Sequence, residues 1–238
     1  MSTPAIRLGR GAVVAAVVLA LALPPVLLGN AVRVISSDWF LRHEYAGTPA
    51  SEVGMTDAQR LELGRTGLSS VRPGGAGIDA LRQARLDGAP AFTEREVAHM
   101  TDVRSVFAGL YRLQLVALVV ALALVVLLVA GRATRMLAFG LAGGGALTVG
   151  LGAFVGIYAA IGFDSFFTWF HGLFFEGSTW EFPASSTLIR IYPEWFWQAA
   201  VAWLAALVLA QALVLIAGGA WTVRRERRRA AAPVAAST

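Results

Sequence analysis

Three histidines, His43, His99 and His171, are the side chains best suited to acid–base chemistry in this 238-residue chain, which contains no cysteine. A histidine gains or loses a proton near neutral pH, so it can act as a general base or a general acid. The chain has no Gly-x-Ser-x-Gly motif and no HExxH motif, which argues against an acyl-enzyme and against a zinc site. We therefore expect proton transfer without a metal or cofactor. For His43, in "DWFLRHEYAG", we expect a structural role.

The composition places these histidines in a membrane protein. Hydrophobic residues make up 57% of the chain and charged residues only 15%, against about a quarter charged in soluble domains. Long apolar segments predict four transmembrane helices, at 11–31, 113–131, 136–161 and 198–222. A signal peptide is the alternative for the first, but its length favours a retained helix. The expected fold class is an all-α integral membrane protein.

The arginines predict the orientation. Nine of the 20 lie in three short regions that we assign to the cytoplasm by the positive-inside rule: the N-terminus, the turn between the second and third spans, and the tail, at 1–10, 132–135 and 223–238. The long 30–112 segment has ten arginines and ten acidic residues, and because of its length it carries little weight in this rule. Two extracytoplasmic segments remain, a mainly helical one at 32–112 and a loop at 162–197. Topology explains the net charge of +5, so we expect no nucleic-acid partner.

Local signals divide the 32–112 segment into helices. Thr56 with Gln59, and Thr93 with Glu96, have the capping-box spacing that marks a helix start. Residues 69–79 are rich in turn formers, and 77–86 predict a short helix. The helix that starts after Thr93 is expected to continue towards the second span.

The predicted topology brings two of the histidines together. His99 lies 14 residues before the span at 113–131, and His171 lies ten residues after the span at 136–161. The four-residue turn between these spans makes them neighbours, so the segments that hold the two histidines should also be close. A histidine pair in a Phe- and Trp-rich setting at a membrane suits acid–base work on a lipid ester. Structural packing of both histidines is the alternative.

Two stretches carry a family resemblance: "GAPAFTEREVAHMTDVRSVF" (88–107) and "FFTWFHGLFFEGSTWEFPASSTLIRIYPEWFW" (166–197). Together with the four-span architecture, they resemble the bacterial lipoprotein intramolecular transacylase family. The resemblance implies an enzyme that moves the sn-2 acyl chain of a diacylglyceryl-cysteine lipoprotein to the α-amino group of the same cysteine, giving a lyso-form lipoprotein. It also implies that His99 and His171 are catalytic and that the site faces outward from the bacterial cytoplasmic membrane.

The resemblance leaves the other site residues as candidates. Asp102, Asp164 and Arg190 are candidates for supporting the histidines or the substrate. Aromatic side chains are candidates for acyl-chain contacts: Phe166, Phe167, Phe170, Phe174, Phe175 and Trp180. The expected partners are diacylated lipoproteins and membrane lipid, and we favour a monomer. A non-enzymatic assembly protein and a phospholipid or lipoprotein esterase remain as alternative functions.

Overall fold

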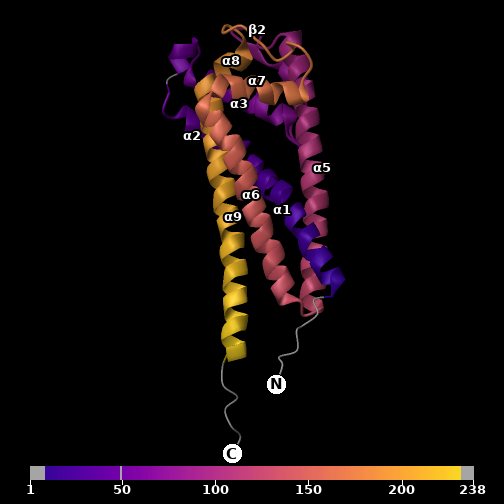
Figure 1. Cartoon of the computed structure of the whole chain (residues 1–238). Helices are drawn as coiled ribbons and strands as arrows, with labels where there is room; N and C mark the ends of the chain where they lie inside the picture. Colours follow the sequence, from indigo (N-terminus) through magenta and orange to yellow (C-terminus); the bar gives the residue numbers. More distant parts are fainter. Residues whose placement is uncertain (1–8, 49, 232–238) are drawn as a thin grey trace, which may run out of the picture. The chain divides into compact units, whose positions relative to one another are not determined.

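Four long helices dominate the computed structural model, which describes residues 9–48 and 50–231 (Figure 1). These four are long and apolar enough to cross a membrane: α1 (Arg10–Ile35), α5 (Glu94–Ala130), α6 (Thr134–Ile161) and α9 (Glu194–Ala231). The chain is therefore a helical, multi-pass membrane protein, as predicted. Parts of the predicted cytoplasmic ends, residues 1–8 and 232–238, lie outside the described residues.

The described residues form two compact units. The first contains 9–28, 114–153 and 207–231, and the second contains 29–113 and 154–206. Within the first unit, α6 approaches its neighbours at glycines. A Cβ atom on Gly144 would lie 2.9 Å from Leu23 Cβ, and one on Gly145 would lie 2.7 Å from the Ala212 carbonyl oxygen. The Gly-rich helix thus packs closely on both α1 and α9, as small residues allow in membranes.

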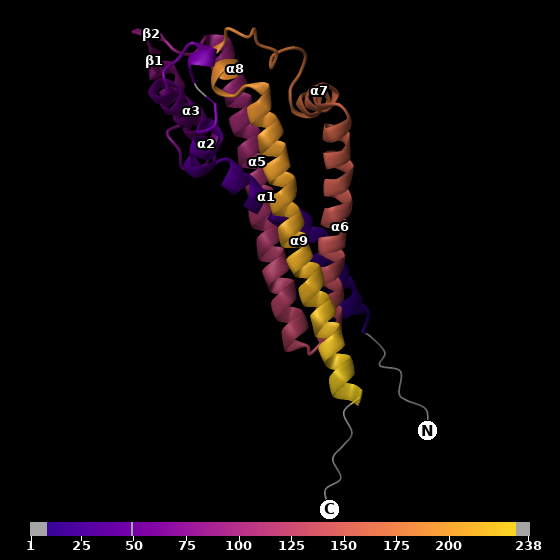
Figure 2. The same ribbon diagram turned by 90° about the vertical axis from the view of Figure 1, so that its left-hand side faces the viewer.

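In the described residues, the second unit combines the adjoining parts of the long helices with eight short elements (Figure 2). They are α2 (Asp38–Tyr45), η1 (Ala50–Val53), α3 (Asp57–Val71), α4 (Asp79–Gln83), β1 (Arg85–Leu86), β2 (Ala89–Pro90), α7 (Phe163–Phe174) and α8 (Thr187–Ile191). Their core includes Phe40, Leu41, Leu81, Val97 and Ile191, each about 1% exposed or less. In Figure 2, α7 is seen nearly end-on and turns away from the axis of α6.

Both predicted capping boxes are confirmed. The Thr56 backbone N–H donates to Gln59 Oε1 at 2.8 Å, and the Gln59 N–H donates to the Thr56 hydroxyl at 3.2 Å. Thr93 and Glu96 make the equivalent pair of bonds at the start of α5. That helix then continues without a break into its apolar segment, as predicted.

The prediction of a helix over 77–86 is wrong after residue 83. The helix α4 ends at Gln83, and residues 85 and 86 form β1, which pairs antiparallel with β2. Asp87 and Gly88, with φ of 51° and 84°, form the turn between the strands. An Asp-Gly pair favours this left-handed turn, so the turn chemistry outweighs the helical pattern before it.

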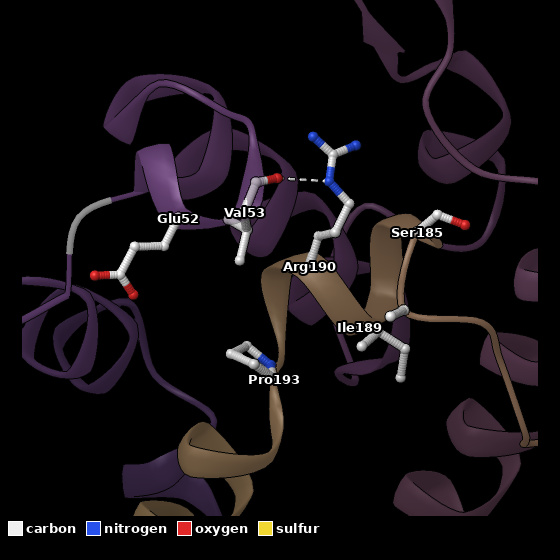
Figure 3. A pocket seen from close by; sticks show the side chains of 7 residues that line it. Glu52, Val53, Ser185, Ile189, Arg190 and Pro193 are labelled. Carbon is white, nitrogen blue, oxygen red and sulfur yellow. Dashed lines mark hydrogen bonds between the residues drawn. The ribbon is translucent and has the colours of Figure 1, made fainter.

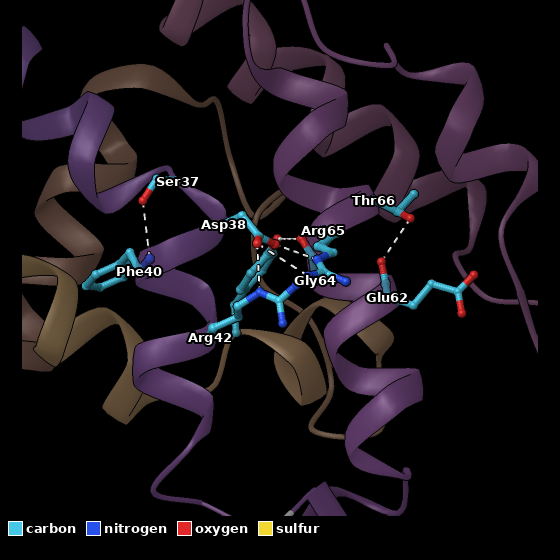
Figure 4. Close-up of polar contacts among 9 residues, drawn as sticks. Ser37, Asp38, Phe40, Arg42, Glu62, Gly64, Arg65 and Thr66 are labelled. Atoms are coloured by element: carbon cyan, nitrogen blue, oxygen red, sulfur yellow. Dashed lines mark hydrogen bonds and ion pairs between the residues drawn. The ribbon is translucent and has the colours of Figure 1, made fainter.

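A charged cluster joins α2 to α3 (Figure 4). The Asp38 carboxylate accepts from Arg65 Nε at 2.5 Å and from Arg42 Nε at 2.7 Å. These hydrogen bonds, from Arg65 first and then Arg42, lower the pKa of Asp38 to about 2. The side chains are about half exposed, so water screens these ion pairs and they contribute little to stability.

Candidate active site

A buried carboxylate fixes the start of α5, one turn before His99. Glu96 is 1% exposed. Its Oε2 accepts from the Thr93 backbone N–H at 2.7 Å and from the Thr93 hydroxyl at 2.9 Å. Its Oε1 accepts from the Leu188 backbone N–H, at the start of α8, at 2.9 Å. The Thr187 hydroxyl adds a hydrogen bond to the Ala91 carbonyl. The helix that carries His99 is therefore anchored at its N-terminus to α8.

The second histidine lies in the last turn of α7. His171 Nδ1 is 2.7 Å from the carbonyl oxygen of Phe167, four residues earlier in the same helix. A carbonyl can only accept, so the neutral ring carries its proton on Nδ1 and keeps a lone pair on Nε2. His171 is thus oriented by its own helix and presents a basic nitrogen.

The two rings lie close together, as the topology predicted. Their centroids are 6.4 Å apart and their planes differ by 23°. This separation is too long for a direct ring-to-ring hydrogen bond, which joins heavy atoms about 3 Å apart. A third group that lies between the two rings could instead contact both of them.

Aromatic side chains surround the pair. Phe175 contacts both histidines, with ring centroids 4.9 Å from His99 and 5.6 Å from His171. Phe167 and Trp180 lie 4.0 and 4.6 Å from His171. Phe170 is 5.6 Å from the same ring. Both histidines are consequently shielded from water on several sides.

This shielding lowers the pKa of both histidines, which lie outside the apolar segments of the chain. Burial, with a smaller repulsion from His171, lowers the pKa of His99 from 6.5 to about 4, although the charge of Asp102 opposes the shift. Burial also lowers the pKa of His171, against the opposing effect of its hydrogen bond to Phe167. Both rings are therefore neutral at pH 7. The His99 Nδ1 atom is buried and has no hydrogen-bond partner among the described residues.

A contact that the sequence pattern did not predict connects the 175–186 loop to this pair. The Phe182 ring lies 5.4 Å from the His99 ring, and the Arg95 guanidinium lies 5.4 Å above Phe182. Arg95 also donates to the Ser178 carbonyl at 2.7 Å. The spacing of Arg95 and His99, four residues apart on α5, was the available signal, because such residues share a helix face.

The other predicted candidates occupy different positions. Asp102 is exposed and acts on His99 through its charge, while Asp164 is exposed in the first turn of α7. Phe166 is buried in contact with Tyr158. Phe174, 48% exposed, contacts Phe170 and Phe175.

Arg190 lines a cavity of about 440 Å³ together with residues of η1 and α8 (Figure 3). Its guanidinium donates to the carbonyl oxygens of Val53 and Gly54, both at 2.7 Å. These bonds direct Arg190 to the end of η1, and neither histidine lines this cavity.

His43 stacks on Trp39, with ring centroids 5.2 Å apart, and meets the edge of Trp203. This packing agrees with the structural role expected for His43.

Comparisons with known proteins identify the family. Residues 17–197 match the family described as "Lipoprotein intramolecular transacylase Lit". An uncharacterised protein of Aquifex aeolicus is 33% identical over 183 residues, which cover 76% of this chain and 81% of that protein. The solved structure of the membrane integral lipoprotein intramolecular transacylase Lit from Bacillus cereus superposes with a TM-score of 0.77 at 17% identity, covering 92% of this chain and 99% of that one. The chain thus belongs to the lipoprotein intramolecular transacylase family and is a membrane enzyme that transfers an acyl group within a lipoprotein.

Proposed function

We propose that this enzyme moves the sn-2 acyl chain of a diacylglyceryl-cysteine to the α-amino group of the same cysteine, with His99 and His171 as its acid–base pair. The observation that carries the proposal is the pair itself: two neutral histidines 6.4 Å apart, enclosed by aromatic rings. Ester and amine belong to one molecule, so the enzyme has only to hold them in a reactive geometry.

His171 is the proposed general base. The α-amino group, whose ammonium form has a pKa of about 8, attacks the ester carbonyl as the neutral amine and must lose one N–H proton as the C–N bond forms. The lone pair on His171 Nε2 accepts that proton, while Nδ1–H stays bonded to Phe167. When the tetrahedral intermediate collapses, the imidazolium returns the proton to the departing glycerol oxygen. A C–N bond replaces a C–O bond, and no water or acyl-enzyme is needed.

His99 is the proposed oxyanion donor. Its buried Nδ1 has no partner among the described residues, and an unpaired buried N–H is costly. Placing the proton on Nε2 avoids that cost and leaves an N–H to donate to the developing oxyanion. In this mechanism the histidine that donates to the oxyanion is neutral and not protonated.

The aromatic residues supply the proposed contacts to acyl chains and membrane lipid. One face of α7 carries exposed apolar side chains at helical spacing: Trp169, Phe170, Leu173 and Phe174. Such a face suits a helix that lies in the interface of a bilayer. We propose that it faces the outer leaflet, with both termini cytoplasmic. A monomer suffices, because one chain supplies both histidines.

The test is mass spectrometry of the N-terminal lipopeptide of a diacylated lipoprotein after incubation with the purified enzyme. We expect the acyl chain to appear on the amine with no change in mass, and His99→Asn and His171→Asn to lower the rate by about 10²–10⁴-fold. His43→Asn, the matched control, should retain the parent rate. Full activity in either active-site variant would refute the pair, and loss of the acyl mass would identify an esterase.

A further inference from the structure

We propose that Arg95 holds the 175–186 loop against the histidine pair and thereby directs the ester to the substrate amine and not to water. This inference rests on the proposed transacylation and adds a residue that determines which product forms. Arg95 lies in the first turn of α5, four residues before His99, so both side chains project from one face of the helix. Arg95 acts here through the loop, as a positioning residue.

The 175–186 loop directs its aromatic side chains to the histidines and its polar side chains to water. Phe175 and Phe182 pack against His99, with ring centroids 4.9 and 5.4 Å from its own. Trp180 packs against His171 at 4.6 Å. Most of the other residues of the loop are exposed. The loop therefore has the composition of a cover, apolar towards the pair and polar towards solvent.

Arg95 attaches the middle of this loop to α5. Its guanidinium donates to the Ser178 carbonyl at 2.7 Å and lies 5.4 Å above the Phe182 ring. One side chain thus holds both the loop backbone and the ring that covers His99. The Glu181 N–H donates to the same Ser178 carbonyl at 3.2 Å, but that bond lies within the loop and does not attach it to α5.

The cover matters because water and the substrate amine compete for one ester carbonyl. In the proposed mechanism, His171 accepts a proton from the attacking group. If water attacks, its oxygen bonds to the carbonyl carbon, the bond to the glycerol oxygen breaks, that oxygen receives the proton, and a free fatty acid leaves. If the amine attacks, the acyl chain stays on the lipoprotein. Both routes use the same base, so the exclusion of water decides the product.

The effect of Arg95 passes through the loop and not through its charge. The charges that shift the pKa of His99 are those of His171 and Asp102, whereas the Arg95 guanidinium is directed to the loop. Replacing Arg95 by Gln keeps both histidines, shortens the side chain and removes the cation–π contact. The expected result is a loop that opens more often and admits water to the ester.

The test measures the ratio of free fatty acid to N-acylated product that the purified full-length enzyme forms from a synthetic diacylated lipopeptide in isotopically labelled water. We expect Arg95→Gln to raise this ratio about three- to tenfold, as loss of one hydrogen bond from a charged group implies, with the label in the released acid. Arg104→Gln is the matched control. Arg104 is exposed and, about two and a half turns further along α5, faces the opposite side of the helix, so the parent ratio should persist.

Two further measurements separate the loop from a general loss of structure. Arg95→Gln should raise the ratio less in a Phe182→Ala background than in the parent, because the two residues act together. Hydrogen exchange in the 175–186 backbone should become faster in Arg95→Gln while exchange in α5 stays the same. Arg95→Lys keeps the charge and a donor for Ser178, so its ratio should lie between those of the parent and Arg95→Gln.

Three outcomes would overturn the inference and leave the proposed function intact. They are an unchanged ratio in Arg95→Gln, an equal increase in Arg95→Gln and Arg104→Gln, and a slower formation of both products in the parent proportion, which marks a purely structural role. A parent enzyme that releases fatty acid and forms no N-acylated product would instead overturn the proposed function, and this inference with it.

Discussion

The protonation of two half-buried rings determines how the reaction rate should depend on pH. Both histidines have pKa values below 6.5, so they stay neutral above that pH, and only the substrate amine, with a pKa of about 8, still has to lose a proton. We predict that the rate rises about tenfold per pH unit between pH 6.5 and 7.5 and levels off above the pKa of the amine. Initial rates on a synthetic diacylated lipopeptide measure this.

A second arm of that experiment separates catalysis from unfolding. Enzyme held at each pH and then assayed at pH 8 should recover the same rate. A maximum near pH 6.5 with a decline above it would show that one histidine must be protonated, and the neutral-pair mechanism would be abandoned.

The residues of the site differ in how far the sequence reveals them. His99 and His171 could be paired from the sequence, because a four-residue turn forces the helices that lead to them together. The hydrogen bond of His171 to the Phe167 carbonyl could not be predicted, and neither could the position of Phe182, although the spacing of Arg95 and His99 indicates that these two share a helix face. The first depends on how the last turn of α7 places a ring against its own backbone. The second depends on the path of an irregular loop with no periodic signal.

At the scale of elements, α5 and α8 are joined by Glu96. Replacing Glu96 by Gln puts an NH₂ group where one carboxylate oxygen accepts hydrogen bonds, so the donors of Thr93 or of Leu188 lose their acceptor. We predict a loss of about 1–3 kcal/mol in unfolding free energy and a lower transacylation rate, because His99 follows one turn later. Thermal melting of the purified protein measures the stability. Glu94→Gln is the control: its side chain is 82% exposed, and equal destabilisation by both variants would contradict the argument.

The close approach of α6 to α1 gives a second prediction. A Cβ atom on Gly144 would meet Leu23 Cδ1 at 2.5 Å and the Ala20 carbonyl oxygen at 3.0 Å, so Gly144→Ala forces the helices apart. We expect a loss of about 1–3 kcal/mol, typical of overpacking, measured by denaturant unfolding in detergent. Gly152→Ala has nothing within 4 Å and should be neutral or slightly stabilising. Destabilisation by Gly152→Ala alone would contradict this account of the packing.

Long, regular helices were easier to predict from the sequence than short, irregular elements. Apolar segments long enough to cross a membrane predicted the four long helices, and the Thr93–Glu96 spacing predicted the start of α5. The β1–β2 hairpin was missed, because two-residue strands carry no period and the decisive signal was a single Asp-Gly turn. The break after α3 could be expected from its glycines, of which Gly74 and Gly77 have positive φ.

For the whole molecule, the proposed topology places the ends of the long helices that are near the histidines on the outer side of the membrane. The proposed topology follows from arginines in the 132–135 turn and after the apolar part of α9. The proposed reaction at the outer leaflet requires both histidines on the outer side of the membrane. The absence of cysteine from the chain allows this to be tested with single-cysteine variants that have no background labelling.

We predict that Ser51→Cys and Glu181→Cys react with a membrane-impermeant maleimide in intact spheroplasts, and that Arg229→Cys reacts only after lysis. All three positions are exposed, so burial does not limit the labelling. The first two lie in the segments at 32–112 and 162–197, and the third lies at the basic end of α9. Labelling of Arg229→Cys alone in intact spheroplasts would invert the topology and place the histidine pair on the cytoplasmic side. Labelling in the predicted pattern would place the pair where a translocated lipoprotein can reach it.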